Sequence, residues 1–194
     1  MSNVLRGKIG VGMWWVVVVA VATIFCGLVY AAVQQDMRQG ANDPLIQMAE
    51  DAAEKLSGGV NPSSIVLAQD FVDIRKGLAP FEIVYDDAGN TLYGYGVLDG
   101  KIPSPPKGVF EYARIHGENR LTWEPARGVR MAIVVVKFSG SNSSGFVLAG
   151  RSLREVEKRE RQLELEVFAA WIVCMMVIVG GFVVSRVYTQ RLSS

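Results

Sequence analysis

The chain has 194 residues, half of them hydrophobic, and a formal net charge of +1, which leaves room for one ordinary domain plus accessory segments. All 19 acidic residues lie between Asp36 and Glu166, and residues 34–166 hold 16 of the basic residues. This central segment is therefore weakly acidic and has no electrostatic reason to bind nucleic acid.

Two long apolar runs bracket the central segment. Residues 9–33 form a run of 25 residues without a charged side chain, and residues 167–185 form a second run of 19. A helix needs roughly 20 apolar residues to cross a bilayer, so both runs are predicted to be transmembrane helices in contact with lipid. The first run exceeds the roughly 7–15 apolar residues of a secretory signal, which favours an uncleaved anchor over a signal peptide cleaved near Ala31.

The orientation follows from the basic residues beside the two runs. Arg6 and Lys8 precede the first run, and Arg186 and Arg191 follow the second. Short basic flanks favour the cytoplasmic side. We therefore predict a two-pass protein of the cytoplasmic (inner) membrane, with cytoplasmic ends and one domain outside. The ends are residues 1–8 and 186–194, and the extracytoplasmic domain is residues 34–166.

Two helices are predicted after the first run. Asn42-Asp43-Pro44 is typical of a helix start, with Asp43 as N-cap and Pro44 in the first turn. Apolar residues then recur at helical spacing until Gly58-Gly59 ends the pattern. Ser63 or Ser64 is predicted to open a second, short helix, with Ile65, Ala68 or Gln69, Val72 and Leu78 near one side.

From residue 81 onward the apolar pattern changes to period two. Strand-like runs flank the turn residues 86–90, and two more flank the turn at 125–128. Between these pairs lie a proline-rich loop and a short segment, residues 109–114, that is compatible with a helix. A last strand is predicted at 146–152. Five strands with helices at both ends predict an α+β domain with a small antiparallel sheet.

The chain after the last strand is predicted to be one long helix that continues into the second apolar run. Ser152 and Glu155 have capping-box spacing. Residues at 3-4-3-4 spacing then form a weak coiled-coil seam interrupted by one glutamate, and a charged helix with a narrow packing stripe explains the same pattern. These residues are Leu153, Val156, Glu160, Leu163 and Val167.

The inventory of reactive side chains argues against catalysis. His116 is the only histidine, and the two cysteines, Cys26 and Cys174, both lie in the apolar runs. Asp86-Asp87 is favoured by turn chemistry alone. We find no phosphate-binding loop, nucleophile elbow or spaced set of metal ligands, so no enzymatic activity, cofactor or metal is predicted.

Aromatic and cationic residues gather in the predicted loop and strands. Such residues can line a small-ligand pocket, although aromatics at period two also build the core of a sheet and arginines are common on surfaces. Both interpretations stay open for the whole set: Tyr85, Tyr93, Tyr95, Phe110, Tyr112, Arg114, His116, Trp123, Arg127 and Arg130.

Several stretches give the chain a family resemblance. They are "RQGANDPLIQMAEDAA", "LDGKIPSPPKGVFEYAR", "GENRLTWEPARGVRMAIVV" and "GFVLAGRSLREVEKRE". With the two apolar runs, residues 34–166 resemble the PAS-like (Cache or PDC type) sensor regions of bacterial membrane histidine kinases. The resemblance implies signal reception outside and transmission inward through the last helix. It also implies a pocket between the sheet and its covering loop, with Tyr95, Arg114, Trp123 and Arg130 nearest to it.

The chain departs from such kinases after the second run, where no linker, phosphoacceptor histidine or ATP-binding domain follows. We therefore expect a sensory protein of a two-component system without catalytic output of its own, corresponding to the input half of a kinase-like receptor. Its expected partners are the bilayer, a small-molecule ligand, a kinase or other output protein, and a second copy of the chain. The alternative is a membrane-anchored interaction protein that docks an envelope partner.

Overall fold

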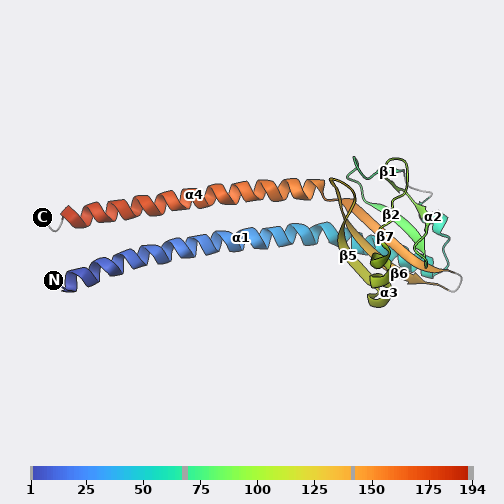
Figure 1. The fold of residues 1–194 in the computed structure, drawn as a ribbon, viewed down its shortest axis with the longest axis horizontal. Helices are drawn as coiled ribbons and strands as arrows, with labels where there is room; N and C mark the ends of the chain where they lie inside the picture. Colours follow the sequence, from blue (N-terminus) through green and yellow to red (C-terminus); the bar gives the residue numbers. More distant parts are fainter. Residues whose placement is uncertain (1, 67–69, 141–142, 192–194) are drawn as a thin grey trace. The chain divides into compact units, whose positions relative to one another are not determined.

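The computed structural model describes residues 2–66, 70–140 and 143–191 (Figure 1). The chain divides into two compact units, each described here by itself. The globular unit is Met37–Lys158, and the helical pair is Met1–Asp36 with Arg159–Ser194. Helices α1 (Ser2–Ser57) and α4 (Arg154–Arg191) contribute residues to both units.

The helical pair consists of two helices that are long and apolar enough to cross a membrane, as their length and composition show. The most apolar stretch of each has none of its residues buried. The helices meet through side chains: the Trp15 and Phe182 rings lie 5.9 Å apart, and Trp171 Nε1 donates a hydrogen bond to Thr23 Oγ1 at 3.1 Å.

The predicted seam on the last helix is a half-buried stripe in the structure. Residues 153, 156, 160, 163 and 167 are all half-buried, while most of their neighbours are exposed. Val167 also lines a shallow hollow together with Thr23, Cys26 and Tyr30 of α1. Within the helical pair, Val167 of the stripe thus lies beside the other helix of the same chain.

The predicted helix start at Asp43 and Pro44 is wrong, because α1 runs through Pro44 to Ser57. A proline inside a helix costs about 3 kcal/mol, since it lacks an N–H and its ring crowds the preceding turn. The residues after Pro44 offset this cost by burial against the sheet: Leu45 and Leu56 are fully buried, and each contributes roughly 1.5–3 kcal/mol. Packing, rather than local propensity, keeps the helix continuous.

The five predicted strands form one antiparallel sheet, as expected, in the order β3-β2-β7-β6-β5. The last strand of the sequence, β7, is therefore the central one. The strands are β2 (Phe81–Asp86), β3 (Thr91–Gly94), β5 (Glu118–Ala126), β6 (Val129–Ser139) and β7 (Ser144–Ser152).

Smaller elements complete the globular unit. Helix α2 (Pro62–Val66) begins slightly earlier than predicted, because Asn61 Oδ1 accepts a hydrogen bond from the Ser63 N–H at 3.0 Å. Ala68 and Gln69, which were predicted to continue this helix, lie outside the described residues. The extension to Val72 and Leu78 is wrong, because Val72 belongs to a short strand and Leu78 lies in no helix. Helix α3 (Lys107–His116) includes residues 109–114, the short segment whose sequence is compatible with a helix. Strands β1 (Val72–Asp73) and β4 (Gly96–Val97) form a parallel pair that was not predicted.

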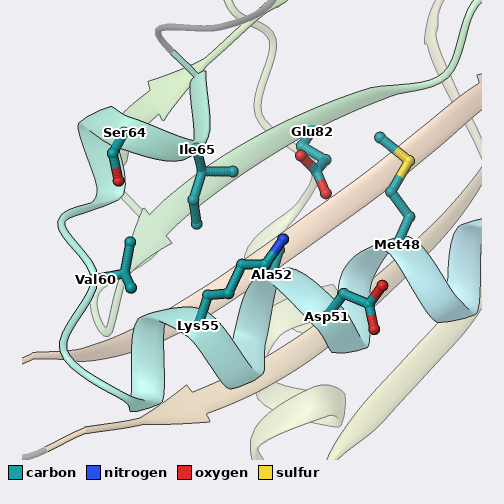
Figure 2. Close-up of a pocket in the computed structure, with 8 residues that line it drawn as sticks. All are labelled: Met48, Asp51, Ala52, Lys55, Val60, Ser64, Ile65 and Glu82. Carbon is teal, nitrogen blue, oxygen red and sulfur yellow. The ribbon is translucent and has the colours of Figure 1, made fainter.

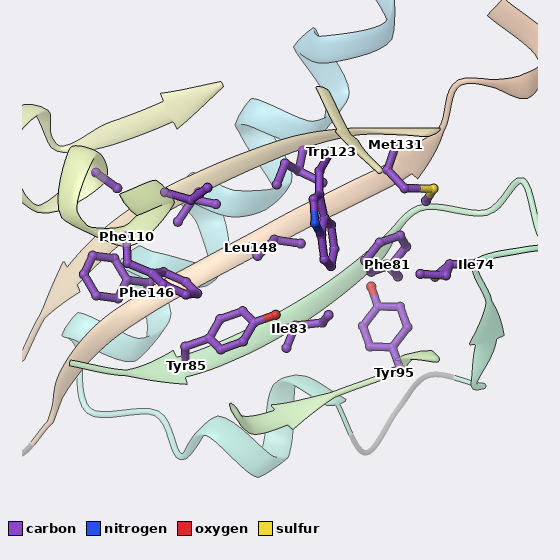
Figure 3. Packing of buried hydrophobic residues seen from close by; sticks show 14 of the residues in the cluster. Ile74, Phe81, Ile83, Tyr85, Tyr95, Phe110, Trp123, Met131, Phe146 and Leu148 are labelled. Atoms are coloured by element: carbon purple, nitrogen blue, oxygen red, sulfur yellow. The ribbon is translucent and has the colours of Figure 1, made fainter. Parts of the chain in front are cut away.

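The sheet has a packed layer on each face. The last turns of α1 cover one face, where Val147 and Ala149 of β7 contribute to the core. On the other face Phe146 and Leu148 join a larger aromatic cluster with α3 (Figure 3). Phe81 is fully buried in this cluster. A Cβ atom added at Gly150 would lie 2.5 Å from the Phe81 Cζ atom, so the ring requires glycine there.

We expect Gly150→Ala to lower the free energy of unfolding by about 1–3 kcal/mol, the usual cost of overpacking. Gly108→Ala is the matched control, because nothing lies within 4 Å of its added Cβ and alanine is favoured over glycine in helix α3 by roughly 0.5–1 kcal/mol. The measurement is urea unfolding of the full chain in detergent micelles, with Trp123 kept as the only tryptophan and followed by fluorescence. Equal stability of the two variants would contradict the packing of Phe81 on Gly150.

Candidate functional site

A polar pocket lies between α1, α2 and β2 in the globular unit (Figure 2). Its volume is about 300 Å3. Helix α1 provides four of the lining residues, the segment through α2 provides three, and β2 provides one. They are Met48, Asp51, Ala52 and Lys55, then Val60, Ser64 and Ile65, and finally Glu82.

Helical periodicity and a glycine turn shape this pocket. Met48, Asp51 and Ala52, and Lys55 are three or four residues apart, so they lie on one side of α1. At the helix end Gly59 has a φ of 90°, a left-handed conformation that suits glycine. The Val60 N–H donates a hydrogen bond to the Lys55 carbonyl at 3.1 Å. Helix α2 follows and forms another wall of the pocket.

Glu82 is the unusual residue of the pocket. It stands in the apolar strand β2, and it is the one charged residue among the buried side chains of the described chain, with 8% of its surface exposed. The Tyr95 hydroxyl donates to Glu82 Oε2 at 3.4 Å, which is long for such a bond. Burial raises the pKa of Glu82, while the Tyr95 bond and the charge of Lys55 lower it and Asp51 raises it.

Lys55 supplies the positive charge of the site. Figure 2 shows its ammonium pointing toward the sheet, on the side of the pocket that Glu82 forms. Among the described residues, however, no ion pair joins Lys55 to Glu82 or to Asp51. The pocket therefore contains two carboxylates and an ammonium that are near one another but not in direct contact.

The four residues predicted to line a ligand pocket do not line the polar pocket. Tyr95 and Trp123 are buried in the aromatic cluster (Figure 3), and Tyr95 reaches the polar pocket only through its bond to Glu82. Arg114 is exposed; its Nη2 donates to the Asp87 carbonyl at 2.6 Å, and its guanidinium lies 5.4 Å from the centre of the Phe146 ring. Sequence reasoning missed Glu82, whose signal was an acidic residue placed between apolar residues within a strand.

Arg130 belongs to β6 and contacts the first turn of α4. Its Nη1 donates to Glu157 Oε1 at 2.5 Å, and its carbonyl accepts from the Leu153 N–H at 3.0 Å. Arg154 Nη2 also donates to the Lys76 carbonyl at 2.9 Å. The first turn of α4 is thus bonded to β6 and to the segment that follows β1.

The capping box predicted for this helix has a different form in the structure. Helix α4 begins at Arg154, so the position before it belongs to Leu153. Ser152 is held in β7 by pairing with Met131, and its Oγ accepts from the Arg154 N–H at 3.3 Å. Ser152 therefore bonds to the first residue of α4 from within β7, and it is not the residue that immediately precedes the helix. Leu153, Val156 and Glu155 are all half-buried.

The residues that line the pocket offer charged groups and aliphatic surface. Among the described residues no cluster of histidine, cysteine or acidic side chains could hold a metal ion. The pocket instead combines buried and exposed charges with aliphatic walls, a composition suited to a small ligand. Comparison with protein-family models, with curated proteins and with solved structures gave no match.

We expect the stability of Glu82→Gln relative to the unaltered chain to increase with pH. The raised pKa means that the folded state holds the Glu82 proton more tightly than the unfolded state. Below its usual pKa of 4.5, Glu82 is protonated in both states and does not lower the free energy of unfolding. As the pH rises through the higher pKa of the folded state, the buried charge lowers that free energy. Urea unfolding between about pH 4 and pH 8 measures this difference. Glu111→Gln, at an exposed position of α3, is the control; a pH-independent difference for Glu82→Gln would contradict the burial of its charge.

Proposed function

We propose that this protein is a membrane-anchored extracytoplasmic sensor, the input half of a histidine-kinase-like receptor without catalytic output of its own. Two apolar helices bracket a small α+β unit with a five-stranded antiparallel sheet. The last strand leads directly into the second apolar helix. This arrangement supports the PAS-like resemblance of residues 34–166. The characteristic sequence stretches of that segment support it as well.

The observation that carries the proposal is the junction of β7 and α4. Only Leu153 separates the central strand from the helix. A change in the packing of the sheet therefore has a direct covalent route to the segment that enters the second apolar run. The bonds of Arg130 and Arg154 couple the same helical turn to β6 and to Lys76.

The polar pocket is connected to this junction through β1. The Tyr95 hydroxyl contacts Glu82, and the Tyr95 carbonyl accepts from the Val72 N–H at 2.7 Å. Strand β1 then leads within a few residues to Lys76, whose carbonyl accepts from Arg154. A ligand would signal by binding two arrangements of this network unequally. Its output would reach a kinase or another partner through the membrane helices, with a homodimer as the expected assembly.

The orientation in the membrane provides the test. In a chain with Cys26 and Cys174 replaced by alanine, we expect Glu111→Cys to react with a membrane-impermeant maleimide in intact bacterial cells, because residues 34–166 would face outward. Tyr188→Cys should react only after the cells are opened, since basic flanks keep this end inside. Both positions are exposed, so burial would not limit labelling. Protection of Glu111→Cys in intact cells would contradict an extracytoplasmic sensor.

A further inference from the structure

We propose that the polar pocket binds a small organic cation with a protonated primary amine, and that Glu82 is its counter-ion. This inference rests on the proposed sensor function and specifies the ligand class. It concerns the face of the sheet covered by α1, whereas the resemblance implied a pocket between the sheet and its covering loop.

The first argument is charge balance. Asp51 and Glu82 face a single cation, Lys55, within the lining of the pocket. Asp51 precedes Lys55 by four residues on α1, the spacing and order that favour an ion pair on a helix. Lys55 points to the Glu82 side of the pocket, and among the described residues it forms an ion pair with neither carboxylate. One cation therefore serves two carboxylates, which leaves an excess of negative charge in the pocket when both are ionised. A buried carboxylate is costly unless a charge and hydrogen bonds compensate it.

The second argument is the direction of the hydrogen bonds. The Ser64 hydroxyl donates its proton to the Asn61 carbonyl at 2.7 Å, so only its lone pairs remain for a ligand. Glu82 and Asp51 are also acceptors when ionised. An ammonium group has three donors and no acceptor, so it can bond to acceptors of this kind. A carboxylate ligand would find Lys55 as its one side-chain donor here and would be repelled by Glu82 and Asp51.

The third argument is size and lining. A volume of about 300 Å3 is at the lower end of the range for ligand pockets, roughly 300–1,000 Å3. Met48, Ala52, Val60 and Ile65 provide aliphatic walls beside the acceptors. The pocket therefore suits a short alkyl chain attached to the amine.

The test uses the full chain in nanodiscs of zwitterionic lipid, with n-butylammonium as the probe. Isothermal titration calorimetry compares it with n-butanol and n-butyrate, which share its alkyl chain but carry no charge or a negative one; empty nanodiscs correct for lipid binding. We expect saturable binding of n-butylammonium alone. Glu82→Gln should weaken it by roughly 10- to 100-fold, the effect of losing a hydrogen bond to a charged group, whereas Glu111→Gln should leave it unchanged.

A second variant separates the proposed site from other binding modes. Lys55→Met removes the positive charge and should maintain or tighten binding of n-butylammonium. Loss of binding in this variant, preferential binding of n-butyrate, equal binding by Glu82→Gln, or no binding of the amine would each overturn the inference. None of these results alters the labelling of Glu111→Cys, so failure of the ligand class and failure of the sensor proposal can be distinguished.

Discussion

The structure depends on one constraint: the central strand of the sheet and the second apolar helix are nearly continuous in the chain. Residues 145–150 of β7 are all buried, because layers cover both faces of the sheet and β2 and β6 pair with both edges of the strand. Such a strand cannot shift alone without losing contacts on every side. Because α4 begins two residues after β7 ends, the position of its first turn follows from the packing of the sheet.

The same packing explains where a polar pocket is tolerated. Side chains alternate along β2, so Phe81, Ile83 and Tyr85 enter the aromatic cluster while Glu82 and Val84 face α1. Val84 lies beneath the continuous apolar side of α1. Glu82 lies where α1 instead presents Asp51 and Lys55, and where α2 leaves space. The apolar residues around Glu82 hold the strand in register, so its carboxylate is placed in the pocket despite the cost of burial.

Much of the fold could be predicted from local sequence. The hairpin at 86–90 was recognisable because Asp86 and Gly89 have turn chemistry: Asp86 accepts from the Asn90 N–H at 2.7 Å, and Gly89 has a φ of 82°. Features that depend on distant residues were not predictable. Pro44 is tolerated because of burial against the sheet, and β1 and β4 are two-residue strands with no periodic signal. The bond from Arg130 to Glu157 could not be predicted, because the two residues lie 27 positions apart in the chain.

The central claim, that the state of the pocket reaches α4, is tested most directly by hydrogen exchange. Amide exchange of residues 153–166 would be compared between the full chain in nanodiscs and its Glu82→Gln form, with Glu111→Gln as the control. The account predicts that removing the Glu82 charge changes exchange at β1, at Lys76 and in the first turns of α4. A change confined to the lining of the pocket, with α4 exchanging as before, would contradict it.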